Sequence, residues 1–156
     1  PDEYPLEAAG CRIDENGKKY IRVKGVRWYT NIDHGRRHNP LSLMSMADNI
    51  KYSKHKDIQG KKYQHYDNYD AIEIPYTDAI PCDYENLMGV PVTFLDKYCP
   101  EQFDIIWQAC GNTRASAPKE ILDEVGYTIH PEDRGGCGVV NNKRQYARIL
   151  IRKKHL

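Results

Sequence analysis

Two stretches of the sequence carry residue types that bind nucleic acid. GVRWYTNIDHGRRH (25–38) places adjacent aromatic rings ahead of Arg36, Arg37 and His38, which can meet phosphate. GNTRASAP (111–118) holds Asn112 and Arg114, residue types that read adenine and guanine edges in the major groove. The alternatives are a packed strand entering a charged turn for the first stretch and a plain strand-to-helix connection for the second, which residue types alone favour.

A run of lysines follows the first stretch. Its members are Lys51, Lys54, Lys56, Lys61 and Lys62, interleaved with Tyr52, Tyr63, His65 and Tyr66. A solvated face is the ordinary explanation of such a run, but rings between lysines also suit bases stacked between neutralised phosphates. Because the net charge is only +1, a polyanionic partner is indicated by this clustering and not by a global field.

No catalytic or metal site emerges from the other reactive residues. Gly135-Gly136-Cys137-Gly138 lacks the glycine spacing and the Lys-Ser/Thr of a phosphate loop, so it predicts a β-turn or bulge. His34 and His38 stand four apart, but Gly35 and Pro40 disfavour the helix that this ligand spacing needs. The aspartates between residues 67 and 83 fit turns better than a magnesium site.

Local patterns predict short elements. Asn16-Gly17 predicts a hairpin of residues 11–14 and 19–23, followed by a strand over 26–30 and a long loop from Asn39. Strands are expected at 71–74 and 103–110, the latter buried, and a short helix between Pro118 and Gly126. Asn141-Asn142 predicts a tight turn into a closing strand in which Ala147, Ile149 and Ile151 share a face. The fold class predicted is α+β, a mostly antiparallel sheet with hairpins, one or two short helices and long loops.

Length and composition predict one globular unit. The chain has 156 residues, of which 40% are hydrophobic, and its five widely spaced cysteines never form a Cys-x-x-Cys pair. Neither a membrane span nor a signal peptide is recognisable, so a cytoplasmic protein is expected. The start at Pro1, without an initiator Met, predicts a fragment of a longer protein.

The order of four blocks resembles a known family. They are GVRWYTNIDHGRRH, YDNYDAIEI, IPCDYENLMGVPVTFLDKYCPEQFDI and VVNNKRQYARILIRKK. Together they are similar to the C-terminal part of the EcoRI-type adenine-specific DNA methyltransferases, from about Asp2 onward and most specifically over 68–98. The resemblance implies a parent enzyme, bacterial or phage-encoded, that transfers a methyl group from S-adenosylmethionine to the exocyclic amino group of adenine in DNA.

The resemblance also implies that the chemistry lies elsewhere. The family's glycine-containing cofactor motif and its Asn/Asp-Pro-Pro-Phe/Tyr catalytic motif do not occur in these residues, and we expect both upstream of Pro1. This chain is therefore expected to hold no catalytic residue, to bind no S-adenosylmethionine alone and to have no activity alone. Its expected partners are double-stranded DNA and the N-terminal catalytic half of the same protein, with no membrane.

Site residues follow from the two lines of reasoning. By analogy with the family, residues 1–40 form the end of the catalytic sheet and 41–156 the DNA-recognition region, and Trp28 or Tyr29, with Asn31, walls the flipped target base. The predicted DNA-binding residues are Arg27, Arg36, Arg37, His38, Lys51, Lys54, Lys56, Lys61, Lys62, Asn112 and Arg114. The alternatives are a stand-alone nucleic-acid-binding module without activity and a protein-interaction domain that uses the acidic region 67–104.

Overall fold

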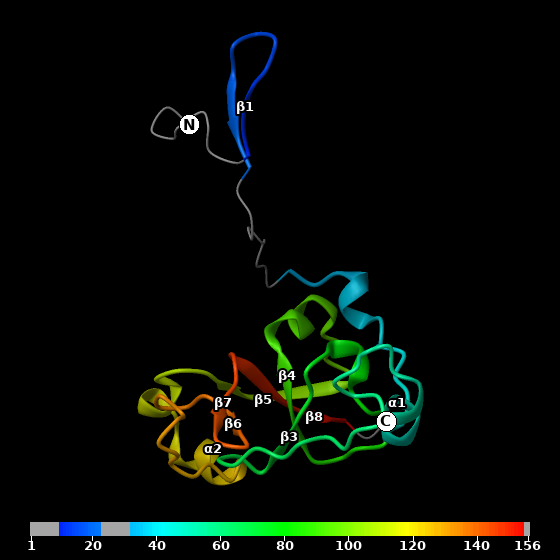
Figure 1. Cartoon of the computed structure of the whole chain (residues 1–156), viewed down its shortest axis with the longest axis vertical. Helices are drawn as coiled ribbons and strands as arrows, with labels where there is room; N and C mark the ends of the chain where they lie inside the picture. Colours follow the sequence, from blue (N-terminus) through cyan, green and yellow to red (C-terminus); the bar gives the residue numbers. More distant parts are fainter. Residues whose placement is uncertain (1–9, 23–31, 155–156) are drawn as a thin grey trace. The chain divides into compact units, whose positions relative to one another are not determined.

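The structure, a computed structural model, describes residues 10–22 and 32–154. The chain divides into two compact units, Pro1–Asp33 and His34–Leu156 (Figure 1). The strand predicted over 26–30 lies outside the described residues.

The first unit contains the predicted Asn-Gly hairpin. Strands β1 (Cys11–Ile13) and β2 (Lys19–Ile21) pair antiparallel, and Gly17 takes a φ of +76° at the turn. Asp14 closes the turn by accepting hydrogen bonds from the backbone N–H groups of Lys18 at 2.8 Å and Asn16 at 3.0 Å. The hairpin prediction is confirmed because its signal is local.

A four-stranded sheet forms the centre of the second unit (Figure 1). Its order is β3 (Ala71–Glu73), β4 (Leu87–Pro91), β8 (Arg148–Lys153) and β5 (Phe103–Ala109). β3 and β4 run parallel, whereas β8 is antiparallel to both β4 and β5. The closing strand of the sequence is therefore an inner strand of the sheet.

Alternate residues of the strands supply two hydrophobic cores, one on each face of the sheet. Ile72, Met88 and Ile151 belong to the larger core, which Phe94 and Phe103 complete. The smaller core takes the alternate positions of the same strands, Ala71, Leu87 and Leu150, together with Tyr66, Tyr69, Ala109, Val125 and Val140. Period-two side-chain alternation explains this division.

Short helices cover the sheet. α1 (Met46–Tyr52) begins at Ser45, whose side chain accepts a hydrogen bond from the Asp48 N–H. α2 (Lys119–Glu124) follows Pro118 and ends before Gly126, where φ is +60°, as predicted. The 3-10 turns are η1 (Gly35–His38), η2 (Thr77–Ala79), η3 (Val92–Lys97) and η4 (Thr113–Ser116).

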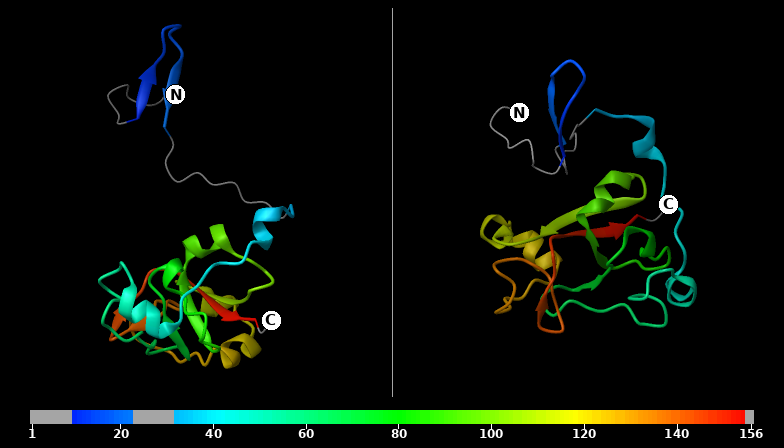
Figure 2. Two further views of the ribbon diagram at one scale, coloured as in Figure 1. Left: turned by 90° about the vertical axis from the view of Figure 1, so that its right-hand side faces the viewer. Right: turned by 45° about the horizontal axis from the view of Figure 1, so that its top comes forward.

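A second hairpin joins β6 (Val139–Val140) to β7 (Lys143–Arg144) at the end of the second unit opposite α1 (Figure 2). Asn141 and Asn142 take φ values of +49° and +59°, which confirms the predicted turn. The prediction that this turn leads directly into the closing strand was wrong. The closing strand β8 begins after a break at 145–147, and it pairs with β4 and β5.

The predicted fold class is confirmed, a mixed α/β chain with few short helices and mostly antiparallel small sheets. The predicted burial of the 103–110 strand was wrong over most of its length. Only Phe103 and Ala109 of β5 are buried, and Ile105 is 42% exposed. β5 lies at the edge of the sheet and its register shifts between Ile105 and Trp107, so one face meets solvent.

Candidate nucleic-acid interface

The predicted base wall lies in a part of the chain outside the described residues. Arg27, Trp28, Tyr29 and Asn31 all fall there, so their roles remain predictions.

The basic triplet of the first stretch forms the 3-10 turn η1. Arg36 is exposed, whereas His38 Nδ1 lies 2.5 Å from Glu101 Oε1 and lowers the pKa of that carboxyl to about 2. The buried Gln102 amide donates to the Leu41 carbonyl at 2.9 Å and accepts from the Leu41 N–H at 2.7 Å. These contacts fasten η1 and the following chain to the start of β5.

A cavity of about 420 Å³ opens beside η1. Arg36 and Lys97 line it together with Asp78, Asp96, Thr77 and residues 39–43. Because both signs of charge are present, the cavity gives no specific preference for phosphate.

The lysine run divides into paired and unpaired charges. Lys54 Nζ lies 2.7 Å from Asp78 and is the main cause of the lowered pKa of that carboxyl. Lys51 Nζ lies 4.8 Å from the centroid of the Tyr52 ring, which is 61% exposed. Lys56, Lys61 and Lys62 are exposed and have no ion pair within the described part of the chain.

Two of the interleaved tyrosines point inward. Tyr66 is only 6% exposed, and the half-buried Tyr63 donates a 2.6 Å hydrogen bond to the Ala79 carbonyl. The alternative of bases stacked on these rings therefore finds no support at Tyr66, which lies in the core, while Tyr63 packs partly buried against the core. Tyr52 keeps an exposed ring.

GNTRASAP forms a turn that is attached to a second loop. Asn112 takes a φ of +65°, and its N–H donates to the Arg134 carbonyl at 3.1 Å. The Arg114 N–H donates to the Gly135 carbonyl at 2.9 Å. The stretch is thus the expected strand-to-helix connection between β5 and α2, and two backbone hydrogen bonds attach it to the turn at 134–135.

A hydrogen-bonded triad holds the Arg114 side chain. Its Nη1 donates to Tyr127 Oη at 2.9 Å and lies 3.8 Å from Asp133 Oδ2, and Tyr127 Oη donates to the same carboxylate. Although burial acts in the opposite direction, hydrogen bonds from Tyr127 and from the Gly135 N–H lower the pKa of Asp133. Arg114 keeps 37% of its side chain exposed, so its guanidinium is pre-oriented and still accessible.

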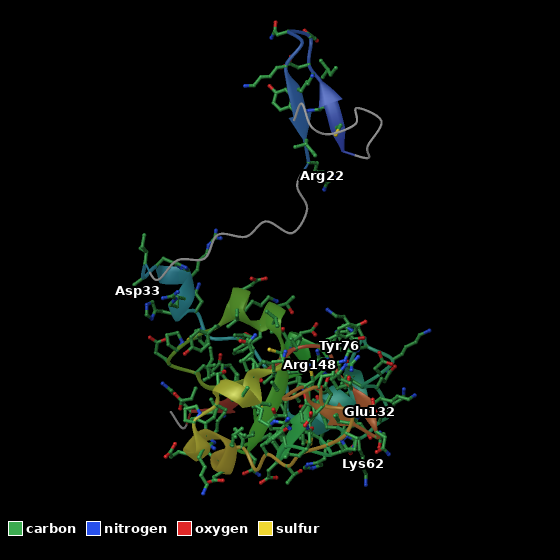
Figure 3. The ribbon with its side chains drawn as sticks, turned by 90° about the vertical axis from the view of Figure 1, so that its left-hand side faces the viewer. Arg22, Asp33, Lys62, Tyr76, Glu132 and Arg148 are labelled. Atoms are coloured by element: carbon green, nitrogen blue, oxygen red, sulfur yellow. The ribbon has the colours of Figure 1, made fainter. Side chains whose placement is uncertain are left out.

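Sequence reasoning missed the buried ion pair between β3 and β8. Arg148 Nη2 lies 2.6 Å and its Nε 2.9 Å from Glu73 Oε1, and both side chains are about one-tenth exposed. The buried Tyr66 hydroxyl also donates to Glu73, and Arg148, labelled in Figure 3, is only 9% exposed. The only signal in the sequence is a charge of each sign within the apolar strands AIEI and RILIR.

Nothing in the sequence indicated, either, that the segment 66–70 holds the backbone of residues 136–139 in place. The Asn68 side-chain amide, 1% exposed, donates to the Cys137 carbonyl and accepts from the Val139 N–H, both at 2.9 Å. Tyr69 Oη donates to the Gly136 carbonyl at 2.5 Å. This segment therefore fixes the glycine-rich turn and β6.

The glycines at 135–138 do not fit a cofactor cradle. A Cβ on Gly136 would lie 2.7 Å from the Cys110 carbonyl oxygen, and one on Gly138 would lie 2.4 Å from Tyr66 Cε1. These glycines allow the chain to pack against itself, as the predicted turn requires.

Within residues 10–22 and 32–154, no three His, Cys, Asp or Glu side chains are grouped as metal ligands, and no helix is long and apolar enough to cross a membrane.

Residues 1–154 match the family described as adenine-specific methyltransferase EcoRI, so the chain belongs to this family. Three curated relatives are type II methyltransferases. M.EcoRI of Escherichia coli is 37% identical over 156 residues, which is 100% of this chain and 39% of that protein. M.MgeORF184P of Mycoplasma genitalium is 33% identical over 144 residues, 91% of this chain and 40% of that protein. M.MpnI of Mycoplasma pneumoniae is 27% identical over 143 residues, with the same coverage.

The chain thus spans about two fifths of the length of these relatives. No solved structure matches it.

Proposed function

We propose that this chain is the C-terminal, DNA-engaging part of an S-adenosylmethionine-dependent DNA adenine methyltransferase. The observation that carries the proposal is the family match along residues 1–154, with relatives that are type II methyltransferases. Cofactor binding and methyl transfer belong to the rest of the longer protein, in which this chain supplies contacts to double-stranded DNA. Such a protein would act on DNA in the cytoplasm.

Within this proposal, residues 1–40 complete the catalytic sheet and 41–156 recognise DNA. Trp28 or Tyr29 stacks on the flipped adenine, and Asn31 belongs to the same wall of the base pocket. Arg27 and Arg37 add to the phosphate contacts. The exposed Arg36, Lys56, Lys61 and Lys62 meet phosphates. Lys51, Lys54 and His38 would have to share or exchange their present partners to do the same.

Asn112 and Arg114 are the proposed base readers. Support comes from the αL conformation of Asn112, which caps the turn η4, and from the Tyr127 and Asp133 contacts that orient the partly exposed Arg114. An oriented guanidinium suits bidentate recognition of a guanine.

Two substitutions in the full-length protein test base readout. Arg114→Ala is expected to relax sequence preference, because it removes the reading group. Tyr127→Phe keeps the guanidinium and removes the hydroxyl that orients it, so a smaller relaxation is expected. Preference is measured as the ratio of kcat/KM on cognate and single-base-changed duplexes. Equal weakening on all duplexes by Arg114→Ala would exclude the readout role.

Salt-dependent binding separates DNA engagement from a protein-interaction role. In a gel-shift assay, we expect the 156-residue chain to bind a DNA duplex and slow its migration at low salt. The affinity should fall as the salt concentration rises. An absence of any shift at low salt would favour an interaction domain that uses the acidic region 67–104.

A stand-alone binding module is the other candidate. The reading frame upstream of Pro1 decides it: an encoded Asn/Asp-Pro-Pro-Phe/Tyr motif supports the enzyme, and a frame without this motif supports the module.

A further inference from the structure

The β6–β7 hairpin presents cations that the proposed function leaves without a role. Lys143 and Arg144 form β7 and are exposed, and Tyr146, two residues after it, is 87% exposed. Across the part of the chain that the structure describes, no carboxylate pairs with Lys143 or Arg144. Two free cations beside a solvent-exposed ring at the end of a β-ribbon require an explanation.

The hairpin has a rigid base. The Asp67 N–H donates to the Val139 carbonyl at 2.7 Å, and the Asn142 N–H donates to the Asp67 carboxylate at 2.8 Å. The Gln145 N–H donates to the Gly138 carbonyl at 2.8 Å. Together with the buried Asn68 amide, these bonds fix the backbone on both sides of the turn, so β7 is held before any partner binds.

Two neighbouring segments extend the positive surface of the hairpin. Asn141 Nδ2 donates to Gln64 Oε1 at 3.1 Å, which joins the tip to the chain that carries Lys61 and Lys62. Arg134 is exposed on the turn before β6. Burial raises the pKa of the Cys137 thiol, and the charges of Arg144 and Arg134 oppose that rise.

The acids of this region do not cancel the surface charge. Asp133 is 3% exposed and is occupied by Tyr127, Arg114 and two backbone N–H groups. Asp67 accepts from the hairpin turn. Glu132 is the exposed acid nearest along the chain to Arg134.

The proposed base readers Asn112 and Arg114 are attached to the turn that precedes β6. Because Asn112 and Arg114 donate backbone hydrogen bonds to Arg134 and Gly135, η4 and the turn before β6 form one hydrogen-bonded unit. A cation on the hairpin therefore stands at a fixed offset from Arg114.

We infer that the β6–β7 hairpin is a phosphate-contacting element, in which Lys143 and Arg144, with Arg134 on the turn before β6, hold the DNA backbone while η4 faces the bases. This inference rests on the proposed function and adds residues to it. Phosphate contacts set the register of a protein on the duplex and carry no sequence information of their own. A two-stranded ribbon with exposed cations also has the width to approach a major groove.

The test is the double variant Lys143→Ala/Arg144→Ala in the full-length protein. We expect weaker binding to every duplex, with the ratio of kcat/KM on cognate and changed duplexes unchanged. The slope of log affinity against log salt should fall in magnitude by about 1.8, since two phosphate contacts release about 0.9 counterion each. The charge-preserving exchange Lys143→Arg/Arg144→Lys is the matched control and should keep the wild-type slope.

The outcomes separate the two proposals. A wild-type protein that methylates adenine while the alanine variant keeps the full salt slope would overturn the hairpin inference alone. The same holds if the charge-preserving exchange loses as much slope as the alanine variant. A wild-type protein that neither binds nor methylates any duplex would overturn the proposed function and the inference with it. Urea unfolding of both variants confirms that these exposed substitutions leave the fold intact.

Discussion

Glu73 and Arg148 connect two strands that do not pair with each other. Glu73 stands on the edge strand β3 and Arg148 on the inner strand β8, with β4 between them, and the bidentate contact spans this gap. Burial opposes the charge of Arg148, yet the bonds to Glu73 raise its pKa, and burial together with the neighbouring Glu73 raises that of Tyr66. A buried charge without a partner at this position would lower the free energy of unfolding strongly.

Removal of the acid should therefore destabilise the fold strongly. Glu73→Gln is expected to lower the free energy of unfolding by about 3 kcal/mol, because Arg148 remains buried without a counter-charge. Urea denaturation measures the change. The control is Glu124→Gln, whose partner Arg152 is 3.1 Å away on the surface and which should cost less than about 1 kcal/mol. Equal costs would contradict a structural role for the buried pair.

The lowered pKa of Asp133 predicts a pH dependence. A carboxyl with a folded-state pKa below the ordinary value of 3.8 contributes stability above that pH and loses it as the pH falls through the folded pKa. The stability advantage of wild type over Asp133→Asn should thus be constant from neutral pH to about 5 and shrink below about 4. Urea midpoints between pH 7 and pH 2 measure it; an advantage that grows on acidification would contradict the assignment.

At the scale of elements, the Tyr66 side chain packs between strand β4 and the β6–β7 hairpin. Its ring occupies the space that Gly89 of β4 and Gly138 before β6 leave open, where a Cβ would lie 2.1 Å and 2.4 Å from ring atoms or the hydroxyl. The hairpin therefore rests on the sheet through one tyrosine and two glycines.

Gly89→Ala should force a rearrangement. Overpacking of this kind costs about 1–3 kcal/mol of unfolding free energy, because Tyr66 must leave its position beside Glu73. Gly35→Ala is the control, since no atom lies within 4 Å of the added carbon. If both substitutions change the urea midpoint equally, Tyr66 does not fill this space in solution.

The β6–β7 turn depends on two left-handed residues. Asn142→Ala should cost about 1 kcal/mol, because alanine disfavours φ near +59°, while Asn142→Gly should be close to neutral. Both variants keep the backbone N–H that Asp67 accepts, so the difference in urea stability isolates the backbone effect. Equal stability of the two variants would contradict the turn geometry.

At the scale of the whole molecule, the sequence predicted what local signals determine. Asn16-Gly17, Asn141-Asn142 and the Pro118-to-Gly126 helix were correct because turn and cap residues act within a few positions. The parallel pairing of β3 with β4 and the inward Tyr66 depend on distant partners, as does the Glu73–Arg148 contact across 75 residues. Local periodicity carries no information about which strand becomes an edge, which is why the burial of β5 was wrong.

Candidate site residues show the same limit. Residue type predicted Asn112 and Arg114, but the contacts that orient Arg114 come from Tyr127 and Asp133, and the turn before the β6–β7 hairpin is hydrogen-bonded to η4 only in the folded structure. The spacing of the lysine run predicted DNA contacts for all its members, but it could not predict that Lys54 pairs with Asp78.

The most direct measurement is methyl transfer by the full-length protein that contains this chain. The protein would be incubated with labelled S-adenosylmethionine and a set of duplexes that covers adenine in every neighbouring sequence context. The account predicts label on the exocyclic amino group of adenine in one sequence context, and none with the 156-residue chain alone. Label on no adenine-containing duplex would contradict it.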